Sequence, residues 1–176
     1  MAQKIDRPEA GEFAEFHKGY MAAVANETDG LAALERQRPL IDRLGQLTPE
    51  QAAFRYADGK WSVKEVTGHL SDAERVLAYR LLRVARGDQT PLPGFDENAF
   101  VVGSNADRRT LGDLAAELAA VRVTTIALVK SLDDDALVRT GTVNNWPLSA
   151  RALAFIIAGH FQHHVNIFRE RYSISL

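Results

Sequence analysis

The sequence predicts an all-α protein, a four-helix bundle in a single domain over residues 1–176, with a short extra N-terminal helix and a long crossover loop. Three observations favour this fold. Long segments carry apolar residues at helical spacing, strand-like alternation is almost absent, and capping residues mark the helix starts. Four such segments with long connections are typical of a helix bundle.

The first part of the chain predicts short helices. Residues 11–24 are amphipathic and are expected to form the extra N-terminal helix. A second helix is expected over residues 29–46. Pro39 lies inside this segment and should kink or divide it, because proline cannot donate a backbone hydrogen bond. Thr48 followed by Pro49 is typical of a capped start of one more short turn.

The clearest helix start in the sequence is at Ser62. Ser62 and Glu65 have the spacing of a capping box, in which each side chain bonds to the backbone of the other residue. Trp61 and Val66 occupy the two positions of a hydrophobic staple. A long helix should therefore begin here and run to about Arg86.

The second half predicts two more long helices. A loop is expected over residues 87–109, where prolines and glycines recur, and its length indicates a crossover connection rather than a tight hairpin. The next long helix is expected at roughly 111–131. A short turn should begin in the acidic run 133–135, and residues 141–147 are expected to form another loop. The last helix is expected over residues 149–172, with a serine cap.

Composition limits the function classes. The net charge of −2 provides no basic excess for nucleic acid or an anionic membrane, and no apolar run approaches the ~20 residues of a membrane span. The N-terminus lacks the apolar stretch of a signal peptide, so a cytoplasmic location is expected. The chain has no cysteine, which excludes disulfides, thiolate ligands and a cysteine nucleophile. Any metal site must use His, Asp or Glu.

Two histidines four residues apart are the most informative feature. His160 and His164 lie in an otherwise apolar helix, on the same stripe as Leu153, Ile157 and Phe168. Burying two imidazoles costs free energy unless each finds a partner. A shared metal ion would supply that partner, because helical residues four apart can close on one ion.

A third ligand is needed, and His69 is the best candidate. It lies two turns into the helix that starts at Ser62, and it shares a broad arc with Val66 and Leu77. Three protein ligands leave room for water or substrate, which is typical of a catalytic metal site. Asp72, one turn away, is a candidate acceptor that could orient an imidazole.

A simpler interpretation stays open for these histidines, since a histidine on an apolar face is usually a core residue. His163 points about 100° away from His164 and is expected to flank the site. His17 is expected at the surface or in an interface.

The catalytic base is not apparent from the His pair. The helical zinc-protease motif has a Glu directly after its first His, whereas this chain has Phe161. The remaining candidates are Asp72, Asp96, Glu97 and metal-bound water. Asp96 and Glu97 also fit an ordinary polar loop. Arg80 is a candidate for binding an anionic group of a cofactor, with a surface salt bridge as the alternative.

Several segments together resemble the DinB-like (DinB/YfiT) superfamily. They are the stretches from Lys60 to Leu70, Thr90 to Asp96, Gly159 to His164 and Arg169 to Tyr172. The resemblance implies an up-up-down-down four-helix bundle, often a homodimer. It also implies a divalent transition metal, Zn or Ni foremost, on three histidines, and the matching positions here are His69, His160 and His164.

The resemblance leaves three functions open. The first is a transferase that uses an external low-molecular-weight thiol, such as bacillithiol or mycothiol, activated by the metal to attack a small-molecule electrophile. The absence of cysteine fits this function. The second is a metal-dependent hydrolase that uses metal-bound water. The third is a non-enzymatic, stress-related protein in which the metal joins two helices.

Overall fold

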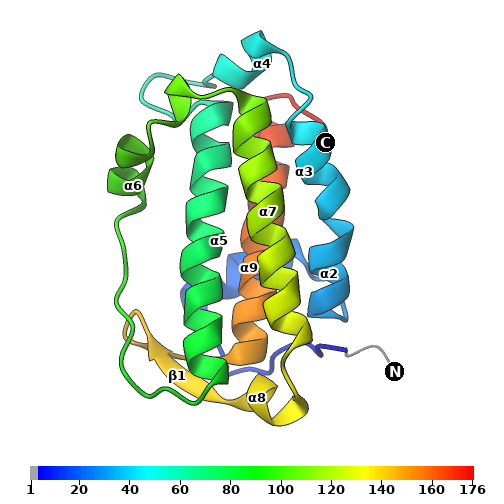
Figure 1. Ribbon diagram of the computed structural model, residues 1–176, viewed down its shortest axis with the longest axis vertical. Coiled ribbons are helices and arrows are strands. Elements are labelled where there is room, and N and C mark those ends of the chain that lie inside the picture. Colours follow the sequence, from blue (N-terminus) through cyan, green and yellow to red (C-terminus); the bar gives the residue numbers. More distant parts are fainter. Residues whose placement is uncertain (1–3) are drawn as a thin grey trace.

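Four long helical segments lie side by side in the computed structural model, which describes residues 4–176 (Figure 1). The expected all-α bundle is confirmed. Its members are α2 (Gly30–Arg36) continued by α3 (Arg38–Leu44), α5 (Val63–Ala85), α7 (Leu111–Lys130) and α9 (Ala150–Arg171).

The helices run up, down, down and up. The Ser62 hydroxyl, at the start of α5, donates to the Asp107 carboxylate just before α7 at 2.6 Å, so α5 and α7 begin at the same end. The Tyr172 hydroxyl, at the end of α9, donates to the Trp61 carbonyl at 2.7 Å, so α9 is antiparallel to α5. Gly45, which follows α3, packs against Ala115 near the start of α7, so α3 ends where α7 begins.

These directions correct the up-up-down-down order that the resemblance implied. Residues 45–62 cross one end of the bundle, so α3 and α5 must be antiparallel. The long connection lies between α5 and α7 instead, and it returns the chain to the end where α5 began (Figure 1). The expected crossover over residues 87–109 is therefore confirmed, and it makes the second and third long helices parallel.

Local signals set the start of α5 as predicted. The Glu65 N–H donates to the Ser62 hydroxyl at 3.1 Å, and the Ser62 N–H donates to the Glu65 carboxylate at 2.8 Å, which completes the capping box. Ser149 caps α9 by accepting from the Ala152 N–H at 3.0 Å. Both caps satisfy backbone donors that have no partner within the helix.

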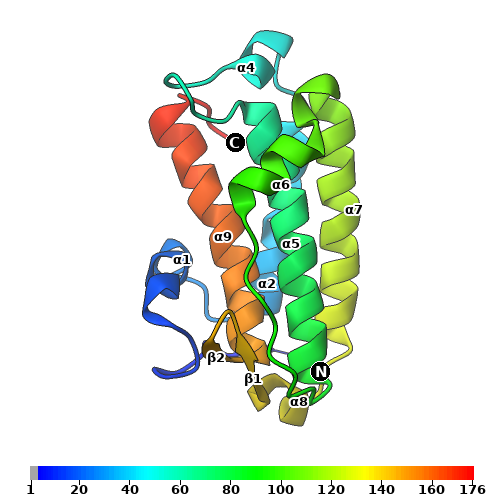
Figure 2. The same cartoon turned by 90° about the vertical axis from the view of Figure 1, so that its left-hand side faces the viewer.

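The N-terminal part is divided more finely than predicted. In place of a helix over residues 11–24, the chain forms a 3₁₀ turn, η1 (Glu15–His17), and a short helix, α1 (Lys18–Ala23), which lie beside α9 (Figure 2). The segment 29–46 is divided at Gln37, just before Pro39, as expected. The short helix α4 (Pro49–Ala53) has the predicted cap at Thr48.

Two regions expected to be loops contain regular structure. The crossover contains α6 (Glu97–Ser104), which covers α5, and the 3₁₀ turn η2 (Ala106–Arg108) (Figure 2). After α8 (Asp134–Val138), strands β1 (Thr140–Val143) and β2 (Trp146–Ser149) form an antiparallel hairpin.

The hairpin is explained by its turn. Asn144 and Asn145 have φ angles of 49° and 68°. Asparagine tolerates this left-handed region, and two such residues make the turn that matches the twist of paired strands. The Leu92 N–H donates to the Thr142 carbonyl at 2.9 Å, so the crossover pairs with the edge of β1.

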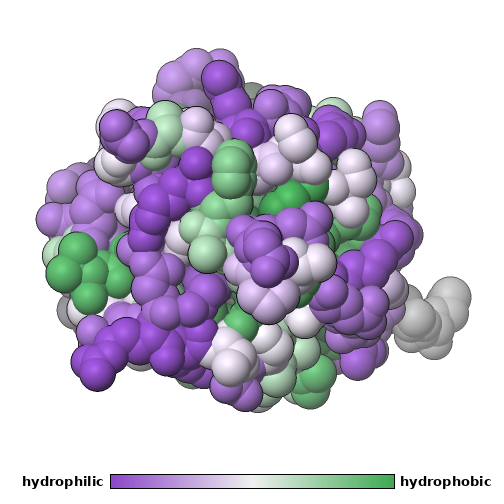
Figure 3. All heavy atoms as spheres, turned by 90° about the horizontal axis from the view of Figure 1, so that it is seen from above, coloured by the Kyte–Doolittle hydropathy of each residue, from purple (hydrophilic) through white to green (hydrophobic). Residues whose placement is uncertain are grey.

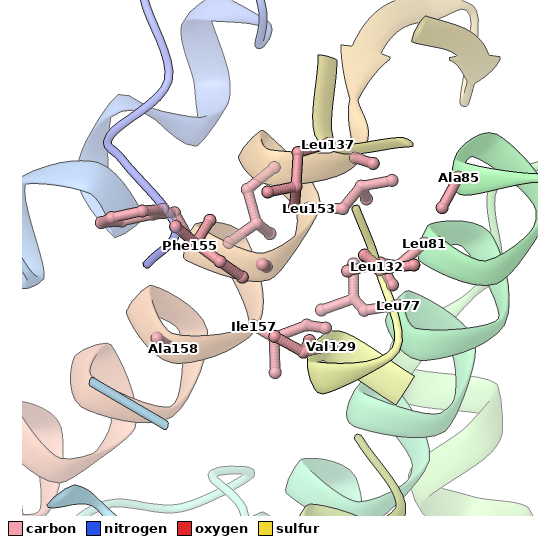
Figure 4. Packing of buried hydrophobic residues seen from close by; sticks show 14 of the residues in the cluster. Leu77, Leu81, Ala85, Val129, Leu132, Leu137, Leu153, Phe155, Ile157 and Ala158 are labelled. Carbon is pink, nitrogen blue, oxygen red and sulfur yellow. The ribbon is translucent and has the colours of Figure 1, made fainter. Parts of the chain in front are cut away.

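The apolar interior forms two clusters along the bundle. Figure 4 shows the cluster nearer the hairpin, where Leu81 of α5, Val129 of α7 and Ile157 of α9 meet. The second cluster surrounds Phe161 and Phe168 of α9, nearer α4. The end of the molecule at α4 is mostly hydrophilic, with scattered apolar side chains (Figure 3). Over residues 4–176, no helix is long and apolar enough to cross a membrane.

A buried ion pair crosses the bundle. Arg122 of α7 donates to both carboxylate oxygens of Glu74 of α5, each at 2.8 Å. Arg122 also donates to the Leu34 carbonyl at 3.2 Å and to the Gln37 side-chain oxygen at 2.9 Å. Its guanidinium lies 5.0 Å from the ring centre of Phe161. The Arg122 side chain thus links α2, α5 and α7 next to Phe161, which follows His160 in the sequence.

Candidate metal centre

Three histidines from two helices converge inside the bundle. His69 comes from α5, and His160 and His164 come from successive turns of α9. Their candidate ligand nitrogens all lie within 4.8 Å of one another. The Nε2 atoms of His69 and His160 are 3.1 Å apart. Helical periodicity and the antiparallel packing of α5 and α9 therefore bring the three predicted residues to one point.

Glycines just before two of these histidines allow close packing around the cluster. Gly68 faces Ala106 of η2, and a β-carbon at Gly68 would lie 3.1 Å from that side chain. Gly159 faces the backbone of Tyr20 in α1, and a β-carbon there would lie 2.3 Å from the Tyr20 carbonyl oxygen. The Tyr20 ring then contacts His160 edge-on, with ring centres 5.4 Å apart.

Burial keeps the three imidazoles neutral. It lowers the pKa of His69 from 6.5 to about 4. Burial, followed by the nearby His69, lowers the pKa of His160 to about 3. The pKa of His164 is also well below its usual value, chiefly because of burial. Neutral imidazole is the form that binds metal ions, so the cluster is in its ligating state at pH 7.

The donor set fits a divalent transition metal. Nitrogen ligands about 2.0–2.1 Å from a tetrahedral ion lie about 3.3 Å apart, close to the 3.1 Å between His69 and His160. The Nδ1 atoms of His69 and His164 are buried and have no hydrogen-bond partner among the described residues. An unpaired buried polar atom is costly, and a bound ion would relieve that cost at a ring that binds it through Nδ1.

The acidic candidates do not hydrogen-bond to the three imidazoles in the described part of the chain. Asp72, expected as an acceptor for His69, pairs instead with Arg75 on the same helix at 3.4 Å. Asp96 caps α6 by accepting from the Ala99 N–H at 3.1 Å. Glu97 is exposed but lines a cavity with His160. Of the three acids, Glu97 is the one that shares a cavity with the cluster.

Two cavities flank the histidine cluster. The first, here named the His164 cavity, has a volume of about 270 Å³ and is lined by His164 with the rings of Tyr56, Trp61 and Tyr172. The second, here named the His160 cavity, has a volume of about 170 Å³. Residues of the crossover, the hairpin and the N-terminal segment line the His160 cavity with His160, so the hairpin, which the sequence did not predict, helps to build it.

Four residues named in the sequence analysis lie in or beside these cavities. Arg80 is buried and lines the His160 cavity, so the surface salt bridge considered for it is absent from the described residues. His17, expected at the surface or in an interface, is buried in the same cavity because η1 folds against the bundle. Trp61, predicted as a staple, also lies against His69, with ring centres 4.9 Å apart. His163 flanks the site as expected, partly buried beside Tyr20.

The sequence matches a known protein family. The model of the DinB superfamily matches residues 33–168, a segment that contains all three histidines. The chain belongs to the DinB superfamily. No curated protein matches the sequence.

The fold of this DinB superfamily member also matches a solved structure. That structure is described as YfiT from Bacillus subtilis, a probable metal-dependent hydrolase with an unusual four-helix bundle topology. The match has a TM-score of 0.65 and covers 96% of this chain and 94% of the other, at 19% sequence identity. At that identity the likeness establishes the shared fold alone.

Proposed function

We propose that this DinB superfamily protein is a metal-dependent enzyme that transfers a low-molecular-weight thiol to a small-molecule electrophile. His69, His160 and His164 are the proposed ligands of a divalent ion, with Zn and Ni as the foremost candidates. The observation that carries the proposal is a cluster of three neutral imidazoles with a cavity on either side.

The ligand set supports chemistry on a weakly acidic group. A divalent ion held there would lower the pKa of a thiol or a water molecule that binds to it. Three neutral imidazoles contribute no negative charge, so the full charge of the ion would act on that molecule. Three ligands also leave at least one position for it.

The surroundings favour a thiol over water as the attacking group. Hydrolysis requires a group that carries protons to and from the reacting atoms. Asp72 and Asp96 are engaged elsewhere, with Arg75 and with the α6 backbone. Thiol transfer needs less help, because a thiol loses its proton far more easily than water does.

Two cavities also suit two reactants. The His164 cavity presents the rings of Tyr56, Trp61 and Tyr172, which can pack against apolar parts of a bound molecule. The Tyr172 hydroxyl is bound to the Trp61 carbonyl at 2.7 Å, so this wall is held in place. The His160 cavity would take the other reactant.

Hydrolysis is the second candidate. Glu97 lines the His160 cavity and could carry a proton there. The similar solved structure is also described as a probable metal-dependent hydrolase. A small molecule is the proposed substrate in either case, and a cytoplasmic location and a homodimeric state stay predictions.

Product analysis separates these functions. Metal-loaded protein would be incubated with thiols and an epoxide or aryl halide, and separately with activated esters without thiol. We expect metal-dependent formation of the thiol adduct, lost in His164→Ala and retained in His163→Ala. Ester hydrolysis that needs no thiol and is lost in Glu97→Gln would favour the hydrolase. Neither activity with a fully loaded metal site would contradict both.

A further inference from the structure

Arg80 is a buried positive charge in the His160 cavity, and residues 4–176 give it no negative partner. Arg80 is only 8% exposed, and no carboxylate oxygen of the described residues lies within 4.0 Å of its guanidinium nitrogens. Its Nη2 donates to the Pro93 carbonyl at 2.6 Å, and its guanidinium lies 5.6 Å from the ring centre of Phe95. A guanidinium has five N–H donors, so these contacts leave donors free for a ligand.

His17 provides a second unsatisfied group in the same cavity. The residue is 7% exposed, and its Nδ1 atom is buried with no hydrogen-bond partner among residues 4–176. Its ring is held between Phe16 and Tyr20, with centres 4.0 Å and 6.4 Å away. A buried polar atom without a partner is uncommon in a native fold, and His17 is one of the residues that line the cavity.

The other residues that line the His160 cavity are compatible with a bound anion. Asn144, at the tip of the hairpin, adds a side-chain amide that can donate hydrogen bonds. Glu97 is the acidic residue that lines the cavity, but it is exposed, so water screens its charge far more than that of buried Arg80. Leu77 and Ile156 make another part of the wall apolar.

We propose that the His160 cavity binds a carboxylate of the small molecule on which the protein acts. Arg80 would be the ion-pair partner and His17 a hydrogen-bond donor. The volume of about 170 Å³ and the apolar wall suit a short carboxylic acid. The link to catalysis rests on the proposed function, because His160 joins this cavity to the candidate metal centre. The carboxylate could belong to the thiol or to its electrophilic partner.

Three probes distinguish these sources. Propionate carries a carboxylate without a thiol, 3-mercaptopropionate carries both groups, and 2-mercaptoethanol carries a thiol without a carboxylate. Each would be titrated into the full-length protein, as purified and after treatment with a chelator. Binding would be followed by NMR chemical shifts, a readout independent of activity.

The matched variants are Arg80→Gln and Arg86→Gln. Arg86 caps the same helix but is exposed and outside the cavity. We expect both carboxylates to bind at least about tenfold more weakly to Arg80→Gln and unchanged to Arg86→Gln, as for loss of a charge-assisted hydrogen bond. Binding of 2-mercaptoethanol should not depend on Arg80. Tighter binding of 3-mercaptopropionate than of propionate assigns the carboxylate to the thiol, and equal binding assigns it to the electrophile.

Several results would overturn the proposal. These are equal binding of the carboxylates to wild type and Arg80→Gln, no binding to either, or the same Arg80 dependence for 2-mercaptoethanol. If Arg80→Gln does not fold, Arg80→Lys and His17→Gln replace it, with partial losses expected. Metal content measured on the same samples tests the proposed function separately, because carboxylate binding to the chelated protein requires no metal.

Discussion

The buried Arg122–Glu74 pair makes a quantitative prediction about the bundle that holds the histidines. Glu74→Met leaves the Arg122 guanidinium buried without its carboxylate, and Arg122→Met leaves Glu74 buried without its cation. Breaking a buried pair from one side costs about 3–5 kcal/mol. For a chain of this length each kcal/mol lowers Tm by about 2–4 °C, so each single variant should lose about 6–20 °C.

The double variant should recover much of that loss. With both charges replaced by methionine, the pair no longer carries a desolvation cost. The Gln37 side-chain oxygen, which accepts from Arg122 at 2.9 Å, would still lose a buried donor, at about 1–3 kcal/mol. The double variant should therefore cost about 1–3 kcal/mol, which implies a coupling energy of at least about 3 kcal/mol.

Urea denaturation of the metal-free protein, followed by circular dichroism, measures the free energies of unfolding of wild type, the two single variants and the double variant. Additive single and double variants would refute the reasoning, as would single variants within about 1 kcal/mol of wild type. The pair lies beside Phe161, 5.0 Å from its ring centre. If the pair acts only through stability, the folded double variant should still bind metal.

Three further predictions concern the surroundings of the site. Gly159→Ala should cost about 1–3 kcal/mol in thermal unfolding by pushing α1 from α9, whereas Gly19→Ala, which faces open space, should be neutral or stabilising; equal effects would contradict this packing. Ser62→Ala should cost about 0.5–2 kcal/mol in urea unfolding through loss of the α5 cap, and no change would show the cap to be dispensable. His17 has its pKa lowered from 6.5 to about 4 by burial, so the unfolded state takes up its proton first as pH falls. As the pH falls from about 6.5 to 4, the free energy of unfolding should therefore decrease, because protonation of His17 favours the unfolded state. Between pH 7.5 and 5 wild type should lose about 1–2 kcal/mol more than His17→Phe, and parallel pH profiles would refute the assignment.

The sequence predicted the structural features that depend only on residues close together in the chain. The cap at Ser62 and the break before Pro39 require only the few residues around them, and the structure has both. The convergence of His160 and His164 follows from helical spacing alone. The position of His69 beside this pair also depends on the packing of α5 against α9. The apolar face around His69 was the sequence signal for that packing.

Features that depend on distant contacts were missed. The direction of the long helices is set by where the single long connection lies. The sequence predicted that connection over residues 87–109, but the helix order was expected from the family resemblance and was wrong. The burial of His17 depends on η1 folding against the rest of the molecule. The hairpin did have a local signal in Asn144 and Asn145, two adjacent residues that tolerate positive φ.

The central claim is that His69, His160 and His164 hold one metal ion. Elemental analysis by mass spectrometry on untagged protein tests it directly, with each histidine replaced by alanine and His163→Ala as the matched control. The account predicts about one ion per chain in wild type and in His163→Ala, and near-complete loss in the other three. Metal retained in all three single variants, or no metal in wild type, would contradict it.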